Sequence, residues 1–152
     1  MTRKKGPPEP GLRLKAEDED DLAVISACLQ DALVPVRDLA YDRNARTFVL
    51  VANRFRWECG APGADGQPFE RTLCGVGFEA IDRVSYRGFQ RGEEDRILSL
   101  LAIRRVPAAI NLEFAGDATI RLSAAAIRCR VRDFGEPWPT VWQPDHAVDQ
   151  PK

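Results

Sequence analysis

The sequence is poor in the residues that metal and acid–base chemistry use most. It holds a single histidine, His146, and four cysteines with no C-x-x-C pair among them, so the spacing of a structural zinc site is missing. The motifs G-x-G-x-x-G, G-x-x-x-x-G-K-[ST], H-E-x-x-H and G-x-S-x-G are missing as well, which argues against a nucleotide-phosphate site, a zincin and a hydrolase elbow. We therefore expect no metal and no cofactor, and the sequence leaves open whether the chain is an enzyme.

Long apolar runs and an excess of one charge are also missing. No run approaches the roughly 20 apolar residues of a membrane-spanning helix, and the basic residues 1–15 lack the apolar segment of a secretory signal. Lys and Arg number 22 against 23 Asp and Glu, for a net charge of −1, so the whole molecule attracts neither nucleic acid nor an anionic membrane. We expect a cytoplasmic protein that binds no membrane, with reduced cysteines buried in its core.

What is present indicates one domain. The chain has 152 residues, 44% of them hydrophobic, which is enough to build a core without disulfides or bound metal. Prolines and basic residues without an apolar pattern predict a disordered tail over residues 1–11. Residues 12–147 are predicted to form a single globular domain, and residues 148–152 a disordered end.

An amphipathic helix is predicted near the start of this domain. Five acidic residues at 17–21 match the positive end of a helix dipole, and Pro35 ends the helix near Leu33. The apolar positions that follow the acidic run have the i, i+3, i+4 spacing of one helix face. They are Leu22, Ile25, Cys28, Leu29, Ala32 and Leu33.

From Val36 onward the apolar residues alternate with period two, which is typical of β-strands. Residues 124–132 are ambiguous, because three alanines favour a helix while alternating arginines favour a strand, and we predict a strand. The predicted strands cover residues 36–41, 46–58, 69–76, 78–87, 97–106, 109–114, 119–123 and 124–132. One N-terminal helix packed on about eight antiparallel strands predicts an α+β fold, mainly β, built as a curled sheet or partial barrel.

The C-terminal residues 133–152 are rich in proline and tryptophan and cannot form a regular helix. We expect this tail to pack back across the sheet and seal the core; alternatively it binds a partner or lines an aromatic pocket. Such a pocket, rimmed by arginine, would suit a small anionic or planar ligand. Alternation places Phe55 and Trp57 on one strand face and the neighbouring arginines on the other. The candidate ligand or partner site is Arg54, Arg56, Trp57, Glu58, Trp138, Trp142 and His146.

Four stretches of the chain carry a family resemblance. They are residues 14–32, Asn-Arg-Phe-Arg-Trp-Glu at 53–58, Leu-Ser-Leu-Leu-Ala-Ile at 98–103, and Pro137-Trp138 followed by Pro144 and His146. Together they resemble the bacterial family called domain of unknown function 2948, found chiefly in alphaproteobacteria, over residues 12–147. The resemblance implies no activity, cofactor or catalytic residue.

Three functions fit these features. The first is a non-enzymatic binding or protein-interaction module, because an antiparallel sheet with open edges offers a surface to a protein partner or to a second copy of the chain. The second is a small-ligand-binding protein or an enzyme, in which Trp57, Glu58, Trp138 and His146 would supply aromatic walls, a carboxylate and a base.

The third function is weak nucleic-acid binding through the arginine-lined residues 128–132 and through Arg104 and Arg105. A strand with arginine at every second position spaces these side chains by about 6.6 to 6.8 Å, which suits successive phosphates. We disfavour nucleic acid, because the net charge is −1 and no aromatic residues interleave with these arginines.

Overall fold

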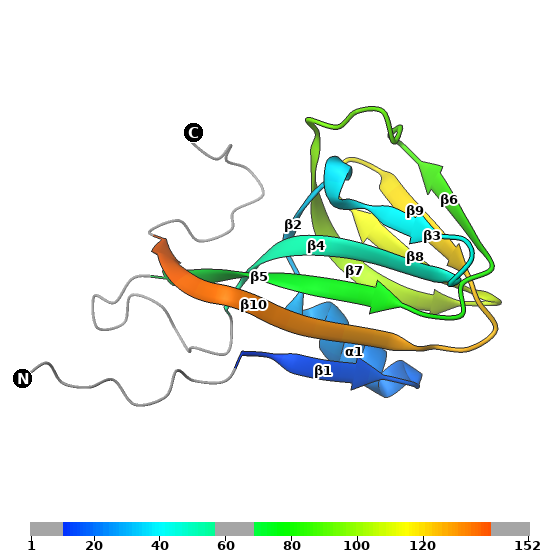
Figure 1. The fold of residues 1–152 in the computed structure, drawn as a ribbon, viewed down its shortest axis with the longest axis horizontal. Coiled ribbons are helices and arrows are strands. Elements are labelled where there is room, and N and C mark those ends of the chain that lie inside the picture. The colour runs from blue at the N-terminus through cyan, green and yellow to red at the C-terminus, as the bar shows by residue number, and fades with distance from the viewer. Residues whose placement is uncertain (1–10, 57–68, 141–152) are drawn as a thin grey trace, which may run out of the picture.

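The computed structural model describes residues 11–56 and 69–140. The strands are β1 (Arg13–Ala16), β2 (Leu33–Pro35), β3 (Ala40–Asp42), β4 (Thr47–Phe55), β5 (Phe69–Phe78), β6 (Arg83–Arg87), β7 (Ile97–Val106), β8 (Ala109–Phe114), β9 (Ala118–Ser123) and β10 (Cys129–Thr140). Within the described residues they form one sheet of ten strands in the order β1-β10-β5-β4-β2-β7-β8-β9-β6, with β3 paired to β4 (Figure 1). The sheet is not closed, and the predicted α+β, mainly β fold is confirmed.

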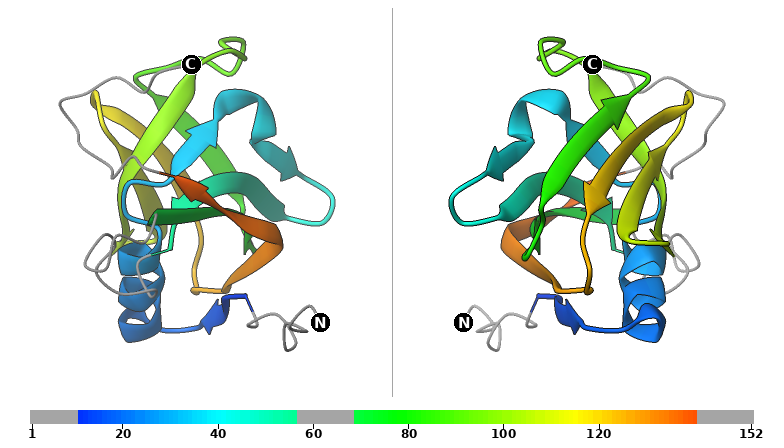
Figure 2. Two further views of the ribbon diagram at one scale, coloured as in Figure 1. Left: turned by 90° about the vertical axis from the view of Figure 1, so that its left-hand side faces the viewer. Right: turned by 90° about the vertical axis from the view of Figure 1, so that its right-hand side faces the viewer.

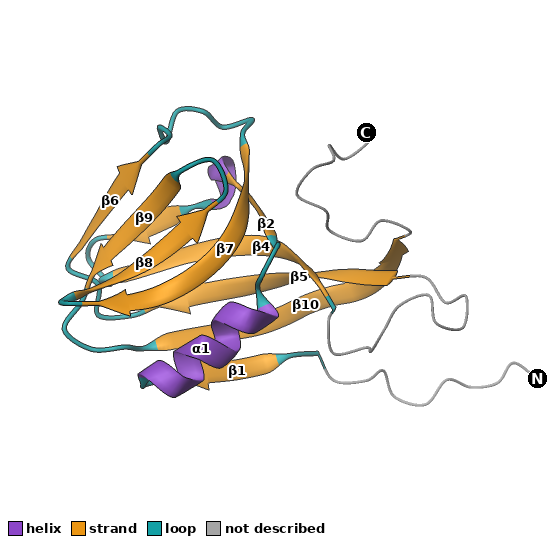
Figure 3. Cartoon of the chain, turned by 180° about the vertical axis from the view of Figure 1, so that it is seen from behind, coloured by secondary structure: helices purple, strands orange, loops and turns teal. Residues whose placement is uncertain are grey.

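The helix α1 (Glu19–Cys28) lies against β7 and β1. Its start follows from charge: Asp18 caps it by accepting a hydrogen bond from the Asp21 backbone N–H at 2.8 Å, and acidic residues fill the first turn. Leu22 and Ile25 are buried against the sheet. Figure 2 shows α1 next to β1 at one end of the molecule, and Figure 3 shows it on the side of the sheet turned away from the viewer of Figure 1.

The helix is shorter than predicted. It ends at Cys28 rather than near Leu33, because Asp31 turns the chain with a φ of 66° and donates its backbone N–H to the Leu100 carbonyl at 2.8 Å. The apolar residues that follow form β2, between β4 and β7, instead of the end of a helix, and Val34 is buried there. A 3-10 helix, η1 (Val36–Asp38), replaces the first part of the strand that was predicted next.

Of the strand predicted over residues 78–87, only residues 83–87 form a strand of their own. β5 ends at Phe78 and β6 begins at Arg83. Between them Ala80 has a φ of 60°, and the Ile81 backbone N–H donates to the Arg46 carbonyl at 2.9 Å. The chain therefore turns over residues 79–82, between the two strands.

The strand predicted over 124–132 begins only at Cys129. Residues 124–128 cross from β9 to the far side of the sheet, where β10 pairs with β5, so they cannot continue the β9 ladder. β10 then runs to Thr140, into the region predicted as an extended tail, with a register shift between Phe134 and Trp138. Backbone pairing thus holds the first part of the tail on the sheet.

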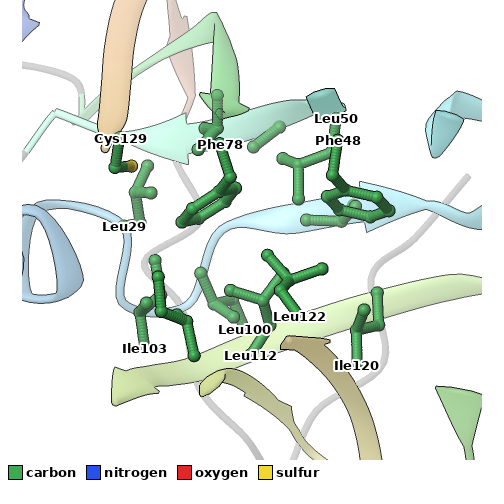
Figure 4. Packing of buried hydrophobic residues seen from close by; sticks show 14 of the residues in the cluster. Leu29, Phe48, Leu50, Phe78, Leu100, Ile103, Leu112, Ile120, Leu122 and Cys129 are labelled. Atoms are coloured by element: carbon green, nitrogen blue, oxygen red, sulfur yellow. The ribbon is translucent and has the colours of Figure 1, made fainter. Parts of the chain in front are cut away.

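The hydrophobic core lies between two walls of the curled sheet. Figure 4 shows side chains of β4, β5 and β10 pointing toward those of β7, β8 and β9. Phe48 and Phe78 lie with ring centroids 6.5 Å apart in this core. The labelled members are Leu29, Phe48, Leu50, Phe78, Leu100, Ile103, Leu112, Ile120, Leu122 and Cys129, all of them buried.

Gly88 offers a test of how tightly the turns are built. It has a φ of +84°, and an added Cβ would meet the Asp117 carbonyl oxygen at 2.5 Å, whereas a Cβ on Gly92 would meet nothing within 4 Å. We expect Gly88→Ala to lower the free energy of unfolding by at least about 1 to 2 kcal/mol, because left-handed backbone and a backbone clash combine. Gly92→Ala is the matched control and should stay within about 0.5 kcal/mol in urea denaturation. Equal stabilities of the two variants would contradict the turn geometry.

Candidate functional site

The candidate site is the face of β1, β10, β5 and β4 that points away from the core, called here the outer face. In Figure 1 the strands β4, β5 and β10 lie in front of α1, and no described helix covers this side. The strand registers align two rows of residues across the four strands. The rows are Arg13, Arg132, Gly75 and Val51, and Lys15, Arg130, Gly77 and Val49.

Like charges stand directly opposite each other at one side of the outer face. Arg13 pairs in register with Arg132, and Lys15 with Arg130, and all four side chains are exposed. In the described part of the chain, carboxylates contact only two of them: Glu17 lies 3.7 Å from Lys15, and Glu79 lies 4.0 Å from Arg130. Exposed pairs at such distances stabilise little. The side of the outer face formed by β1 and β10 is therefore positively charged.

The middle of the outer face is flat. Gly75 and Gly77 remove two successive outward side chains from β5, and neighbouring apolar groups lean over them. A Cβ on Gly75 would lie 3.9 Å from a ring carbon of Phe134, and one on Gly77 would lie 3.8 Å from a methyl group of Val49. Phe134 is 44% exposed and Val49 is 43% exposed. A cationic edge thus borders a shallow apolar surface.

Arg54, a predicted site residue, lies on the opposite, core-facing side of β4. Its side chain is 0% exposed and makes two hydrogen bonds to the carboxylate of Asp133 on β10, Nε to Oδ1 at 2.9 Å and Nη2 to Oδ2 at 2.7 Å. The same carboxylate accepts the Leu12 backbone N–H at 2.8 Å. This buried ion pair ties β4 and β10 to the residue before β1.

The other predicted site residues fall at the same end of the sheet or outside the described residues. Arg56 lies in an ion pair with Glu70 at 2.7 Å. Trp138 is placed by its backbone alone, opposite Arg71 on β5. The structure therefore brings three of the seven predicted residues to neighbouring strand ends. Trp57, Glu58, Trp142 and His146 lie outside the described residues.

Arg71 was missed by sequence reasoning. It pairs in register with Phe55, its guanidinium lies 5.7 Å from the Phe55 ring centroid, and its Nη2 donates to the Asn53 carbonyl at 2.9 Å. Burial lowers the pKa of Arg71, while the charge of Asp31 acts in the opposite direction. Arg71 lies between Glu70 and Thr72 in the sequence, and this polar context does not predict a buried side chain.

Phe134, Arg13 and Lys15 were missed as well. The alternation through Arg130 and Arg132 continues to Phe134 two residues later, and this was the available signal. The pairing of β1 with β10, which brings in Arg13 and Lys15, is a long-range contact that local patterns do not report.

The described residues offer little acid–base or metal chemistry. Burial raises the pKa of the Cys129 thiol to about 12, and it raises that of Cys74 to about 12 with a further contribution from the charge of Asp133. Among residues 11–56 and 69–140, no group of three or more His, Cys, Asp or Glu side chains could hold a metal ion, and no helix has the length and apolar character to cross a membrane. What this part of the chain does present is a surface suited to binding.

The fold and this surface define a mainly β protein with one covering helix and an open, basic sheet face. The chain matches the family model described as protein of unknown function (DUF2948) over residues 12–146, and it belongs to this family. The resemblance noted in the sequence is thereby confirmed. No curated protein and no solved structure matched the chain.

The Arg54–Asp133 ion pair predicts a large stability effect. Arg54→Met should lower the free energy of unfolding by about 3 to 5 kcal/mol, because it leaves a buried carboxylate without its counter-charge. The double variant Arg54→Met/Asp133→Asn should lose less than the sum of the two single variants in chemical denaturation. Arg104→Met breaks an exposed pair with Glu113 and, as the control, should cost less than about 1 kcal/mol. Additive losses would contradict direct coupling.

The buried thiols give a prediction on reactivity. With a pKa of about 12 for both Cys74 and Cys129, almost no thiolate exists at neutral pH, and the thiolate is the reactive form. In a Cys28→Ser/Cys59→Ser variant we expect no reaction with a thiol reagent in the folded state and reaction of both thiols after unfolding in guanidinium. Rapid labelling of the folded variant would contradict the burial of these side chains.

Proposed function

We propose that the chain is a non-enzymatic binding module that recognises an anionic partner through the outer face. The observation that carries this proposal is the direct opposition of Arg13 to Arg132 and of Lys15 to Arg130. Like charges opposite each other in an antiparallel pair lower stability, so folding alone gives no reason for this arrangement. A negatively charged partner supplies a counter-charge to Arg13 and Arg132, which contact no carboxylate among the described residues, and adds to the weak contacts that Glu17 and Glu79 make with Lys15 and Arg130.

The surroundings of these cations support a macromolecular partner. The outer face is flat over Gly75 and Gly77 and exposes Phe134 and Val49 beside the cations. Small ligands are bound in concave sites that enclose most of their surface, whereas an open sheet face fits an extended chain. A protein partner in the cytoplasm, or a second copy presenting its exposed acidic residues 17–21, would also offer negative charge.

The aromatic-pocket alternative, as a small-ligand site or an enzyme, remains a prediction. It depends on Trp57, Glu58, Trp142 and His146, which lie outside the described residues. Of the two arginines expected at the rim of this pocket, Arg54 forms an ion pair with Asp133 and Arg56 forms one with Glu70. No contact among the described residues favours this alternative over the outer face.

The charge arrangement allows a test in which stability and binding change in opposite directions. Arg130→Glu/Arg132→Glu turns both like-charge rows into opposite-charge rows. We expect the row of Arg132 and Arg13 to add about 0.2 to 1 kcal/mol to the free energy of unfolding, while at residue 130 the gain opposite Lys15 is partly offset by repulsion from Glu79, which lies 4.0 Å from Arg130. We expect the unmodified chain to be retained on a heparin column at low salt and the same variant to lose this retention. Thermal denaturation and elution salt concentration measure the two effects.

The matched control is Arg83→Glu/Arg87→Glu. It makes the same change in net charge at two exposed residues of β6, which pair in register with uncharged Ser123 and Thr119. Retention on heparin should persist in this control. Equal loss of retention in both variants, or destabilisation by the Arg130 and Arg132 reversal, would contradict the proposed role of the outer face.

A further inference from the structure

We propose that the partner of the outer face is a single-stranded nucleic acid, an inference that rests on the proposed function above. Three features of the described strands carry it: the spacing of the cations, an exposed aromatic ring in line with them, and the flat surface beside both. Together they give the combination of a basic track and a stacking platform that proteins use to bind single strands.

The cations form a regular track. Arg130 and Arg132 follow each other on the outer side of β10, and Lys15 and Arg13 stand opposite them on β1. Alternate residues of a strand are separated by about 6.6 to 6.8 Å, and a flexible single strand can adjust its phosphates to that repeat. Two neighbouring strands therefore offer cations to up to four phosphates, which compete with Glu17 for Lys15 and with Glu79 for Arg130.

Phe134 continues the same line. It is the next outward residue of β10 after Arg132, it is 44% exposed, and its ring lies over Gly75. Against the earlier expectation that no aromatic residue accompanies these arginines, the fold places one beside them. An exposed aromatic ring can stack on any base, because every base has a π-face.

The form of the surface favours a single strand over other polyanions. Gly75 and Gly77 add no side chains that would project past the Phe134 ring, which is 44% exposed, so an unpaired base can reach the outward side of the ring. The bases of a duplex are already stacked on each other and are not available to this ring. An acidic peptide would satisfy the cations and would gain nothing from base stacking.

The experiment measures binding of fluorescently labelled oligonucleotides of about 16 nucleotides, the upper end of the usual site size, by anisotropy. The ligands are oligo-dT, oligo-U, a duplex of the same length, and a polyglutamate peptide of equal charge. Four phosphate contacts predict a slope of log affinity against log salt of about −3 for the single strands. Arg130→Glu/Arg132→Glu should reduce this slope to about half or less and weaken binding at least about tenfold at low salt.

The ring is tested separately from the charges. Phe134→Leu should weaken single-strand binding about fivefold or more without changing the salt slope, because stacking is lost and the phosphate contacts remain. Phe134→Tyr keeps the ring and should retain the affinity. Ile97→Ala, at an exposed apolar residue of β7, is the control for removing surface hydrophobicity. Melting curves of all variants show whether each is folded.

The outcomes separate this inference from the proposed function. Binding of polyglutamate with no affinity for single strands overturns the inference and leaves the proposed function standing. Equal affinity for single strands and polyglutamate with no effect of Phe134→Leu, or a preference for the duplex, also overturns it. Failure to bind any of the polyanions overturns both proposals.

Discussion

The buried ion pair between Arg54 and Asp133 is the interaction on which the outer face depends. It joins β4 to β10 across the intervening β5, and Asp133 also exchanges two hydrogen bonds with the backbone of Leu12, at 2.8 and 2.9 Å. A shift of β10 by one residue would turn Asp133 outward and bury Arg132 in the core, and an unpaired buried charge is costly. The pair therefore fixes the register that sets Arg132 opposite Arg13.

The core-facing side of β10 contributes to stability, and its outward side carries the proposed binding surface. Toward the core, Cys129 and Val131 alternate with the exposed arginines and pack with side chains of both walls. Away from the core, the like-charge rows oppose folding, but each costs only about 0.2 to 1 kcal/mol against a total stability of about 5 to 15 kcal/mol for a domain. The core can support a surface arranged for an anionic partner.

Local periodicity predicted most of the elements, and its failures have identifiable causes. The acidic run and the apolar spacing after it located α1, but residues 32–34 fit a helix face and a buried strand equally well. Leu33 and Val34 belong to β2 because they pair with β7, and Leu33 also with β4, and local patterns do not report these pairings. The alternation of Cys129 and Val131 with arginines predicted a strand, but the predicted strand began at residue 124, whereas β10 begins at Cys129.

Local patterns predicted the candidate site less well than they predicted the fold, because the site depends on contacts between distant residues. Alternation correctly separated Arg54 from Phe55, but it could not tell which side of β4 faces the core. Both side chains are buried: Arg54 is paired with Asp133 on the core-facing side, and Phe55 lies beneath Arg71 on the other side. A buried arginine is recognised only when its carboxylate partner is known, and that partner lies 79 positions away in the sequence.

Net charge misleads for a related reason. The value of −1 describes the whole chain, but at physiological salt a partner senses charges only within a Debye length of about 8 Å. Neighbouring strands lie about 4.8 Å apart and alternate residues about 6.7 Å apart, so Arg13, Arg132, Lys15 and Arg130 act on a bound anion as one group. Glu17 and Glu79 lie within the same length, 3.7 Å from Lys15 and 4.0 Å from Arg130, so the positive charge of the outer face is greatest toward Arg13, Arg132 and Phe134. The fold thereby separates charges that cancel in the composition, and the separated positive charges form the surface that an anionic partner meets.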